Sequence, residues 1–405
     1  MSATVDETHA PNPDSAKNAE RRALGVACGA HALHDGYTDL IYVLLPVWQN
    51  EFGLGFAALG LLKTVFSGTL AGFQIPAGFL AERFGSATIL TLGTALAGLG
   101  YVLAGFSNGV AFLVAALFVG GLGTSTQHPL ASSLIAHAFA GPRSLKALGT
   151  YNFAGDIGKM TLPAAAALLL VVLPWRHTVM LLGVLGGVAA LTIFFAMPRF
   201  RDTTDTLRKN DDAASAGTPV PGYAFPLLLS VGVIDSATRM AFLTFLPFVL
   251  TSKGASLQTV GLALTLVFAG GAAGKLVCAF IGARIGTVAT VWLTEVVTAF
   301  GILALLPLPL EVALPLLLVI GVALNGTSSV LYGSVPDIVE PSGRQRAFSI
   351  FYTGTIGAGA VSPALYGLLG DAVGIPAALF VVAMVVLVTL PITLVLRPAL
   401  VVRPS

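Results

Sequence analysis

Two histidines and two aspartates lie close together in the first strongly apolar stretch of the chain, HALHDGYTDLIYVLLP (31–46). They are His31, His34, Asp35 and Asp39. The spacing of four between His31 and Asp35, and between Asp35 and Asp39, places these groups on one broad face of a helix. A carboxyl group beside a second carboxyl and an imidazole is suited to taking up and releasing protons near neutral pH. The same nitrogen and oxygen donors are also suited to a transition metal.

Further ionisable residues lie inside other long apolar stretches, where they are costly unless they face a cavity or a partner. Asp156 and Lys159 are three residues apart, and Asp235 and Arg239 are four apart. Each pair leaves two interpretations open: an ion pair within one helix that neutralises itself, or groups that bind a substrate. The candidate substrate-binding residues are His128, Asp156, Lys159, Asp235 and Arg239.

Three more charged residues stand alone in their apolar stretches: Lys63, Lys275 and Glu295. We expect Lys63 to lie near the outer surface and to extend its ammonium group towards water. The sequence assigns no role to Lys275 or Glu295.

The composition points to an all-α polytopic membrane protein. The chain has 405 residues, of which 56% are hydrophobic and only 10% are charged, with a mean hydropathy of +0.88, whereas a soluble protein carries about 25% charged residues. Its apolar runs are long and continuous, which favours membrane-spanning helices over the alternating strands of a barrel. Twelve spans are predicted at residues 24–48, 56–81, 87–106, 110–137, 145–172, 174–198, 223–250, 257–282, 287–307, 312–338, 346–370 and 375–396.

The second half of the chain repeats the first at an offset of 201 residues. The matched pairs are Pro46 and Pro247, Gly60 and Gly261, Arg83 and Arg284, Gly85 and Gly286, Gly120 and Gly321, and Tyr151 and Tyr352. Two six-helix bundles in the same orientation are the layout of a parallel-repeat transporter. The predicted units are a tail (1–23), a first bundle (24–198), a linker (199–222), a second bundle (223–396) and a tail (397–405).

The distribution of basic residues predicts the orientation. If both termini and the linker are cytoplasmic, fifteen of the 21 Lys and Arg residues fall on that side, two fall on the other side and four lie within spans. This bias is what the positive-inside rule requires.

The stretch GFLAERFG (78–85) follows the second predicted span. Its glycines, Gly78 and Gly85, permit close helix approach and a tight turn, and Glu82 and Arg83 are able to bridge to neighbouring helices. These four residues are the predicted conformational gate.

This stretch resembles the loop signature G-x-L-a-D-R-x-G of the major facilitator superfamily, with Glu82 in place of the aspartate, and Ser86 and Ala87 in place of the basic residues that usually follow. Within that superfamily the chain is most similar to fosmidomycin-resistance-type drug exporters. Two stretches carry this resemblance, HALHDGYTDLIYVLLPVWQNEFGLGFAALGLL (31–62) and VGGLGTSTQHPLASSL (119–134). In the fifth span, GDIGKMTLP departs from the antiporter pattern by placing its proline late, at Pro163.

The resemblance implies a proton-driven exporter (an antiporter) of a small molecule, in a bacterial cytoplasmic (inner) membrane and with both termini in the cytoplasm. It implies alternating access between the bundles, no cofactor beyond the proton gradient, no nucleic-acid partner and a monomer in the lipid bilayer. In this interpretation Asp35 carries the proton, tuned by its three neighbours, and Lys159 and Arg239 hold an anionic group of the substrate.

Two other kinds of transport and one kind of enzyme are alternatives. Proton-coupled uptake of a metabolite uses the same architecture. Export of a divalent metal would use the imidazoles and carboxylates as ligands, namely His31, His34, Asp35, Asp39 and His128. An enzyme is the least favoured, because no span carries an HExxH motif or a comparable nucleophile arrangement.

Overall fold

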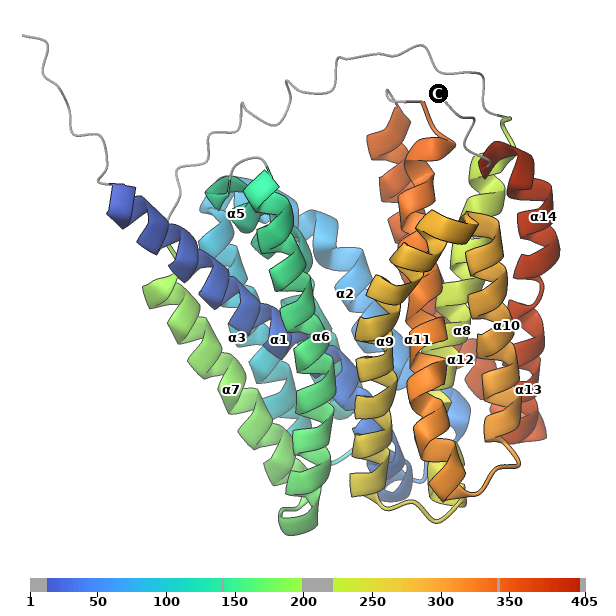
Figure 1. Cartoon of the computed structure of the whole chain (residues 1–405). Helices are drawn as coiled ribbons and strands as arrows, with labels where there is room; N and C mark the ends of the chain where they lie inside the picture. The colour runs from blue at the N-terminus through green and yellow to red at the C-terminus, as the bar shows by residue number, and fades with distance from the viewer. Residues whose placement is uncertain (1–12, 140–141, 199–220, 341–342, 401–405) are drawn as a thin grey trace, which may run out of the picture.

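The computed structural model describes residues 13–139, 142–198, 221–340 and 343–400, and its elements are helices (Figure 1). Most of the predicted linker, residues 1–12 of the first tail and residues 401–405 of the last lie outside the described residues. The helices are α1 (Pro13–Phe52), α2 (Phe56–Phe84), α3 (Ser86–Gly105), α4 (Val110–Thr124), α5 (Gln127–Ala138), α6 (Pro142–Val172), α7 (Trp175–Ala196), α8 (Ala224–Ser252), α9 (Leu257–Ile285), α10 (Thr287–Leu305), α11 (Leu310–Ser334), α12 (Arg344–Val373), α13 (Ile375–Val386) and α14 (Thr389–Leu400), with a 3₁₀ turn, η1 (Val335–Asp337), after α11.

The described part of the chain has eleven helical segments that are long and apolar enough to cross a membrane. The first helix, α1, is long enough to be the twelfth, but its histidines and aspartates make it too polar to meet the same criterion. The predicted all-α architecture with twelve spans is therefore confirmed. Helix α1 begins at Pro13, so part of the segment that we expected to be a tail is helical.

Two of the predicted spans, the fourth and the twelfth, are interrupted helices. The fourth is divided into α4 and α5 at Ser125 and Thr126. Because Pro129 has no N–H, it cannot bond to the carbonyl of Ser125, so the helical ladder is broken there. The hydroxyl groups of Ser125 and Thr126 donate instead to the carbonyls of Leu122 and Gly123, at 2.7 and 3.0 Å. This break places His128 in the first turn of a new helix.

The repeat found in the sequence is also present in the backbone. Helices α2 and α9 have the same length, 29 residues, and their bounds are 201 positions apart. Glycines with positive φ recur at the same offset, at Gly53 and Gly254 and again at Gly85 and Gly286. These two glycine pairs end equivalent helices in the two halves, and each needs a backbone conformation that other residues rarely adopt.

Helices α1–α7 and α8–α14 form two groups that meet at one end of the molecule and diverge towards the end where α1 begins and α14 ends (Figure 1). The groups touch mainly through α2 with α12 and α6 with α9. The contact of α2 with α12 depends on glycines, since a Cβ at Gly60 would overlap the carbonyl of Pro363, and one at Gly367 would overlap the carbonyl of Phe56. We call the end where α2 begins and α12 finishes the far end.

One carboxylate joins the two groups at the far end. Asp371, near the end of α12, accepts hydrogen bonds from the backbone N–H groups of Phe56 (2.6 Å) and Ala57 (3.0 Å), the first two residues of α2. Gly55 leaves room for the carboxylate, whose oxygens would lie 3.0 Å from a Cβ there. Asp371 therefore caps a helix of the other half, where the helix dipole favours a negative charge.

We predict that Asp371→Asn opens the far end. The amide loses the charge and one of the two acceptors, which should weaken the cap by roughly 1 kcal/mol and shift the populations about five-fold. Spin labels at positions 50 and 252, in the last turns of α1 and α8, report the far-end separation by pulsed electron resonance once Cys28 and Cys278 are replaced. The distance distribution should gain a longer component. Glu311→Gln, an exposed acid at the same end, is the control, and an equal change in it would contradict the capping role.

Candidate functional site

A cavity of about 490 Å³ lies between the two groups of helices, and residues of both line it. That volume is within the usual range for small-molecule sites. Most of the ionisable residues predicted from the sequence contribute to its wall, and two of the unassigned lysines join them. These wall residues are Asp35, Asp39, Lys63, His128, Asp156, Lys159, Asp235, Arg239 and Lys275.

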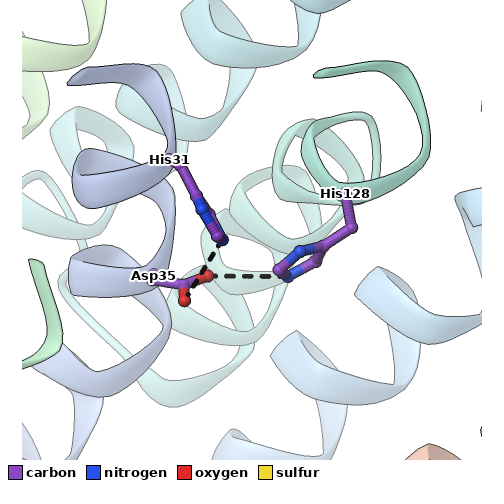
Figure 2. Close-up of side chains that lie close together, drawn as sticks. All are labelled: His31, Asp35 and His128. Atoms are coloured by element: carbon purple, nitrogen blue, oxygen red, sulfur yellow. Dashed lines mark ion pairs between the residues drawn. The ribbon is translucent and has the colours of Figure 1, made fainter. Parts of the chain in front are cut away.

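Asp35 is at the centre of the charged groups from the first half. Its side chain is 8% exposed, and three basic groups from α1, α5 and α6 surround it. Lys159 Nζ lies 3.2 Å from Asp35 Oδ2, His31 Nε2 lies 3.4 Å from the same oxygen, and His128 Nε2 lies 3.5 Å from Oδ1. Figure 2 shows the two imidazoles converging on the carboxylate from different helices. The sequence predicted the pair on α1, and the structure adds Lys159 and His128 to it.

Helix α6 approaches α1 closely enough to bring Lys159 to Asp35 because glycines face α1. A Cβ at Gly155 would lie 2.6 Å from Asp35 Oδ2 and 2.7 Å from His31 Cε1, and a Cβ at Gly158 would overlap the backbone of Ala32. The ring of His31 stacks on that of Tyr151, with centroids 3.9 Å apart. The geometry of the site therefore depends on small residues in α6.

The hydrogen bonds of His31 determine where its proton lies. Its Nδ1 is 2.8 Å from the carbonyl oxygen of Tyr151, and because a carbonyl only accepts, Nδ1 carries the hydrogen. In a neutral ring, Nε2 then has only a lone pair, yet it is buried without a hydrogen-bond partner and faces the oxygen of Asp35. One added proton, on the imidazole or on the carboxyl, would turn this repulsive contact into a hydrogen bond.

A metal is the alternative occupant of the same position. His31, Asp35 and His128 offer three ligand atoms within 4.8 Å of one another, a donor set that suits a transition metal. However, the ammonium group of Lys159 is closer to Asp35 than either imidazole nitrogen. A metal would have to bind beside that charge or displace it, whereas a proton requires neither.

His34 does not join this cluster. Its Nε2 lies 2.9 Å from the hydroxyl oxygen of Thr94 on α3, and its side chain is fully buried. Asp39 does line the cavity, one turn after Asp35, and is 6% exposed. Within the described residues it has no ion-pair partner within 4.0 Å, although Lys159, Lys63 and Arg239 all lie within electrostatic range.

The ion pairs within single helices, one of the two interpretations left open by the sequence, are not formed among the described residues. Asp156 instead pairs across the two halves with Lys275 of α9, at 2.6 and 2.8 Å, and its former candidate, Lys159, contacts Asp35. Asp235 and Arg239 are not within 4.0 Å of each other among the described contacts, and the closest polar contact of Arg239 is Ser328, at 3.4 Å. No ion pair within 4.0 Å is therefore seen inside either helix among the described residues: Asp156 and Lys159 each have a partner on another helix, and Arg239 contacts Ser328 of α11.

The prediction that Lys63 reaches the surface is also wrong. Lys63 is 1% exposed, donates to the carbonyl of Thr38 at 2.6 Å and lies over the ring of Tyr42. In the described part of the chain neither Lys63 nor Arg239 has a carboxylate within 4.0 Å, so each presents to the cavity a positive charge without a direct counter-ion.

The comparisons with known proteins agree with this architecture. The family model described as Major Facilitator Superfamily matches residues 27–234 and again residues 227–404. The chain belongs to the major facilitator superfamily. It is therefore a secondary transporter of the general kind found in that superfamily, and not an enzyme.

Individual members of the superfamily resemble most of the chain. The fosmidomycin resistance protein of Escherichia coli is 25% identical over 355 residues, which is 86% of each chain. A protein of Cupriavidus pinatubonensis named "Probable 4-methylmuconolactone transporter" is 25% identical over 352 residues, 84% of this chain and 82% of its own. In fold, the chain matches the crystal structure of a bacterial homolog of the human lysosomal transporter Spinster in an inward-facing, occupied conformation, with a TM-score of 0.80. The match covers 98% of this chain and 100% of that one, at 15% sequence identity.

The signature loop of the superfamily lies away from the contact between the halves. Gly85 makes the turn between α2 and α3, with φ of +87°, as predicted. Gly78, by contrast, faces open space, so the expected close helix approach is not present there. The guanidinium of Arg83 lies over the ring of Phe84, and the described ion pairs include neither Arg83 nor Glu82. In this conformation the predicted gate is not engaged.

Sequence reasoning missed the partners that come from other helices. Lys275 and Tyr151 contact the predicted acids and histidines, and Gly155 makes their approach possible, yet none of the three was assigned to the site. The segment GDIGK (155–159) did indicate the close approach of another helix. Two glycines on one helix face, beside charged residues, are typical of close helix packing.

We predict a measurable energetic coupling between Asp156 and Lys275. Lys275→Gln leaves the buried Asp156 carboxylate without its partner, so thermal stability should fall, and Asp156→Asn in the same chain should restore part of the loss. We expect a coupling of about 1–2 kcal/mol in a double-mutant cycle, moderated because the lysine side chain is 39% exposed. The exposed pair Glu20 and Arg143 provides a control cycle with coupling near zero. Additive losses at Asp156 and Lys275 would show that their contact contributes nothing.

Proposed function

We propose that this chain is a proton-coupled transporter of a small organic anion that works by alternating access. The observation that carries the proposal is the contact between Lys159 Nζ and Asp35 Oδ2, at 3.2 Å in the wall of the cavity between the halves. It combines in one place a group that binds protons and a group that binds anions.

The charges of the cavity support an anionic substrate. Among the residues that the structure describes, Lys63 and Arg239 have no carboxylate within 4.0 Å, and Lys159 is 31% exposed and available from the cavity. Two of these three cations come from the first half and one from the second, so an anion between them would contact both. One relative is named "Probable 4-methylmuconolactone transporter", so the substrate stated in its name is a small organic molecule.

The contact between Lys159 and Asp35 also determines how proton and anion affect each other. An anion that draws the ammonium group away leaves Asp35 buried with less positive charge around it. An uncompensated buried carboxylate is costly, so the added proton is bound more readily when the anion is present. By linkage, the proton favours the anion to the same extent. Joint binding is the requirement for symport, so we favour symport over the antiport that the resemblance implies.

The proposed direction follows from the orientation of the chain. We place both termini in the cytoplasm, in a bacterial cytoplasmic membrane, because of the basic residues on that side. The contacts between the halves would then close the outer end, and the cavity would face the cytoplasm. A proton gradient directed into the cell would drive the anion inward with the proton.

Export is the second candidate, supported by the similarity to the fosmidomycin resistance protein over 86% of the chain. Antiport requires that proton and substrate compete. At this site a cationic group bound to Asp35 would compete with the proton, whereas an anion would not. The two candidates therefore predict opposite charges for the substrate group that contacts the first half.

We predict that binding of the correct anion makes the purified protein take up protons from a weakly buffered solution. A panel of small carboxylates, sulfonates and phosphonates would be tested, with proton uptake followed by a pH-sensitive dye. Asp35→Asn imitates the protonated state, so this variant should bind the same anion with less dependence on pH and with little proton uptake. It should also exchange substrate across liposomes while failing to concentrate it.

Two results would contradict the proposal. Proton release on substrate binding would establish competition and favour export. Uphill transport by Asp35→Asn would place the coupling proton elsewhere. Lys159→Gln should weaken binding of the anion far more than binding of a neutral analogue, and Glu311→Gln, an exposed substitution outside the cavity, serves as the control.

A further inference from the structure

A second pair of buried acids lies in the other half of the molecule, on α8 and α10. Asp235 is 3% exposed and lines the cavity, while Glu295 is 1% exposed and is not among the residues of the cavity wall. The two carboxyl groups lie within electrostatic range of each other and of Arg239. Glu295 is therefore separated from the cavity by the wall to which Asp235 belongs.

The internal repeat places these two residues at facing positions. Asp235 and Glu295 occupy the positions 201 residues after His34 and Thr94. In the first half those two residues are in direct contact, with His34 Nε2 2.9 Å from the Thr94 hydroxyl oxygen. The second half thus has two acids where the first half has a hydrogen-bonded neutral pair.

The charges around the two acids do not balance. Arg239 is the one basic residue in electrostatic range of both, and it has no carboxylate oxygen within 4.0 Å among the described residues. Of the charged groups on the helices packed against α10, Lys275 is paired with Asp156, and Arg284, Glu311 and Arg397 are exposed. Two buried acids and one base leave one negative charge without compensation, which is expensive inside a membrane.

The hydroxyl groups next to Glu295 show which form of the acid they accommodate. Thr294 donates to the carbonyl of Thr290 at 3.0 Å, and Thr327 donates to Thr294 at 2.7 Å. Both hydroxyl hydrogens are therefore used, and among the described residues Glu295 Oε1 is buried without a hydrogen-bond partner. A buried carboxylate oxygen that accepts no hydrogen bond is costly, so these surroundings suit the neutral acid.

We propose that Asp235 and Glu295 form a second proton-binding site, in which the two carboxyl groups hold one proton between them beside Arg239. The proton reaches the cavity through Asp235, the member of the pair at the wall. This site is distinct from the one around Asp35, because it lies in the other half and shares no residue with it. Two carboxyl groups that cannot both be ionised are known to hold one proton in this way.

Infrared spectroscopy of the purified protein in lipid tests the site without any substrate. A protonated carboxyl group has a carbonyl stretching band that shifts in heavy water, and its intensity counts the protonated groups. All variants carry Asp39→Asn, which removes the other cavity acid within electrostatic range of Arg239. In this background Glu295→Gln and Asp235→Asn should each remove one carboxyl group from the band, because Arg239 then balances the acid that remains.

A variant that should increase the band distinguishes a shared proton from a single buried acid that is always protonated. Arg239→Gln removes the compensating charge, so both acids should become protonated and the band should gain one carboxyl group. Glu311→Gln, at an exposed acid, should leave the band unchanged. An unchanged band in Glu295→Gln would overturn the proposal, and so would an unchanged band in Asp235→Asn. Glu295→Gln has nearly the shape of the neutral acid and is expected to fold, so the decision does not depend on the arginine variant.

Discussion

The need to neutralise one buried carboxylate, Asp35, controls the organisation of the first half. Its charge in an apolar surrounding requires basic partners, and the sequence provides them on three helices. Gly155 lets α6 come close enough for Lys159 to reach it, and the break before α5 directs His128 towards it. Weakening any of these features would remove one of the basic groups that neutralise the carboxylate. The packing of α1, α5 and α6 and the neutralisation of Asp35 therefore depend on each other.

The contacts between the two halves differ from those around Asp35, because most of them are backbone packing and hydrogen bonds between uncharged groups. Such contacts can break and re-form without leaving a charge buried. Glycines of α2 and α12 and the cap provided by Asp371 hold the far end together, and α6 touches α9 through Thr265, whose hydroxyl donates to the carbonyl of Met160 at 3.0 Å. The ion pair of Asp156 with Lys275 lies in the cavity wall between these contacts and the open end. A change of charge in the cavity would therefore act directly on groups that join the halves.

The fold was predictable to a large extent and the site only in part. The number of spans and the repeat follow from hydropathy and from an offset that recurs along the chain, both of which are properties of the sequence alone. The residues of α1 were found because polar groups in an apolar helix stand out. Their partners were not, because spacing within a helix identifies neighbours on that helix and says nothing about the next one. Asp156 illustrates this: Lys159 is three residues away in sequence, but Lys275 of α9 makes the ion pair. Lys63 was misplaced for the same reason, since its acceptor, the carbonyl of Thr38, belongs to another helix.

The internal repeat makes the chemical difference between the halves clear. The two bundles share helices α2 and α9 of the same length and the same glycine turns, so residues 201 positions apart occupy equivalent places in them. At one such pair of positions the first half has His34 in contact with Thr94, and the second half has Asp235 and Glu295. Conversely, the positions 201 residues after Asp35 and Lys159 are Ser236 and Ala360, neither of which carries a charge. The symmetric scaffold provides two halves that can move against each other. Because the two halves present different charged groups to one cavity, a proton or an anion bound on one side acts on unlike groups on the other, and that asymmetry allows binding to favour one arrangement of the halves.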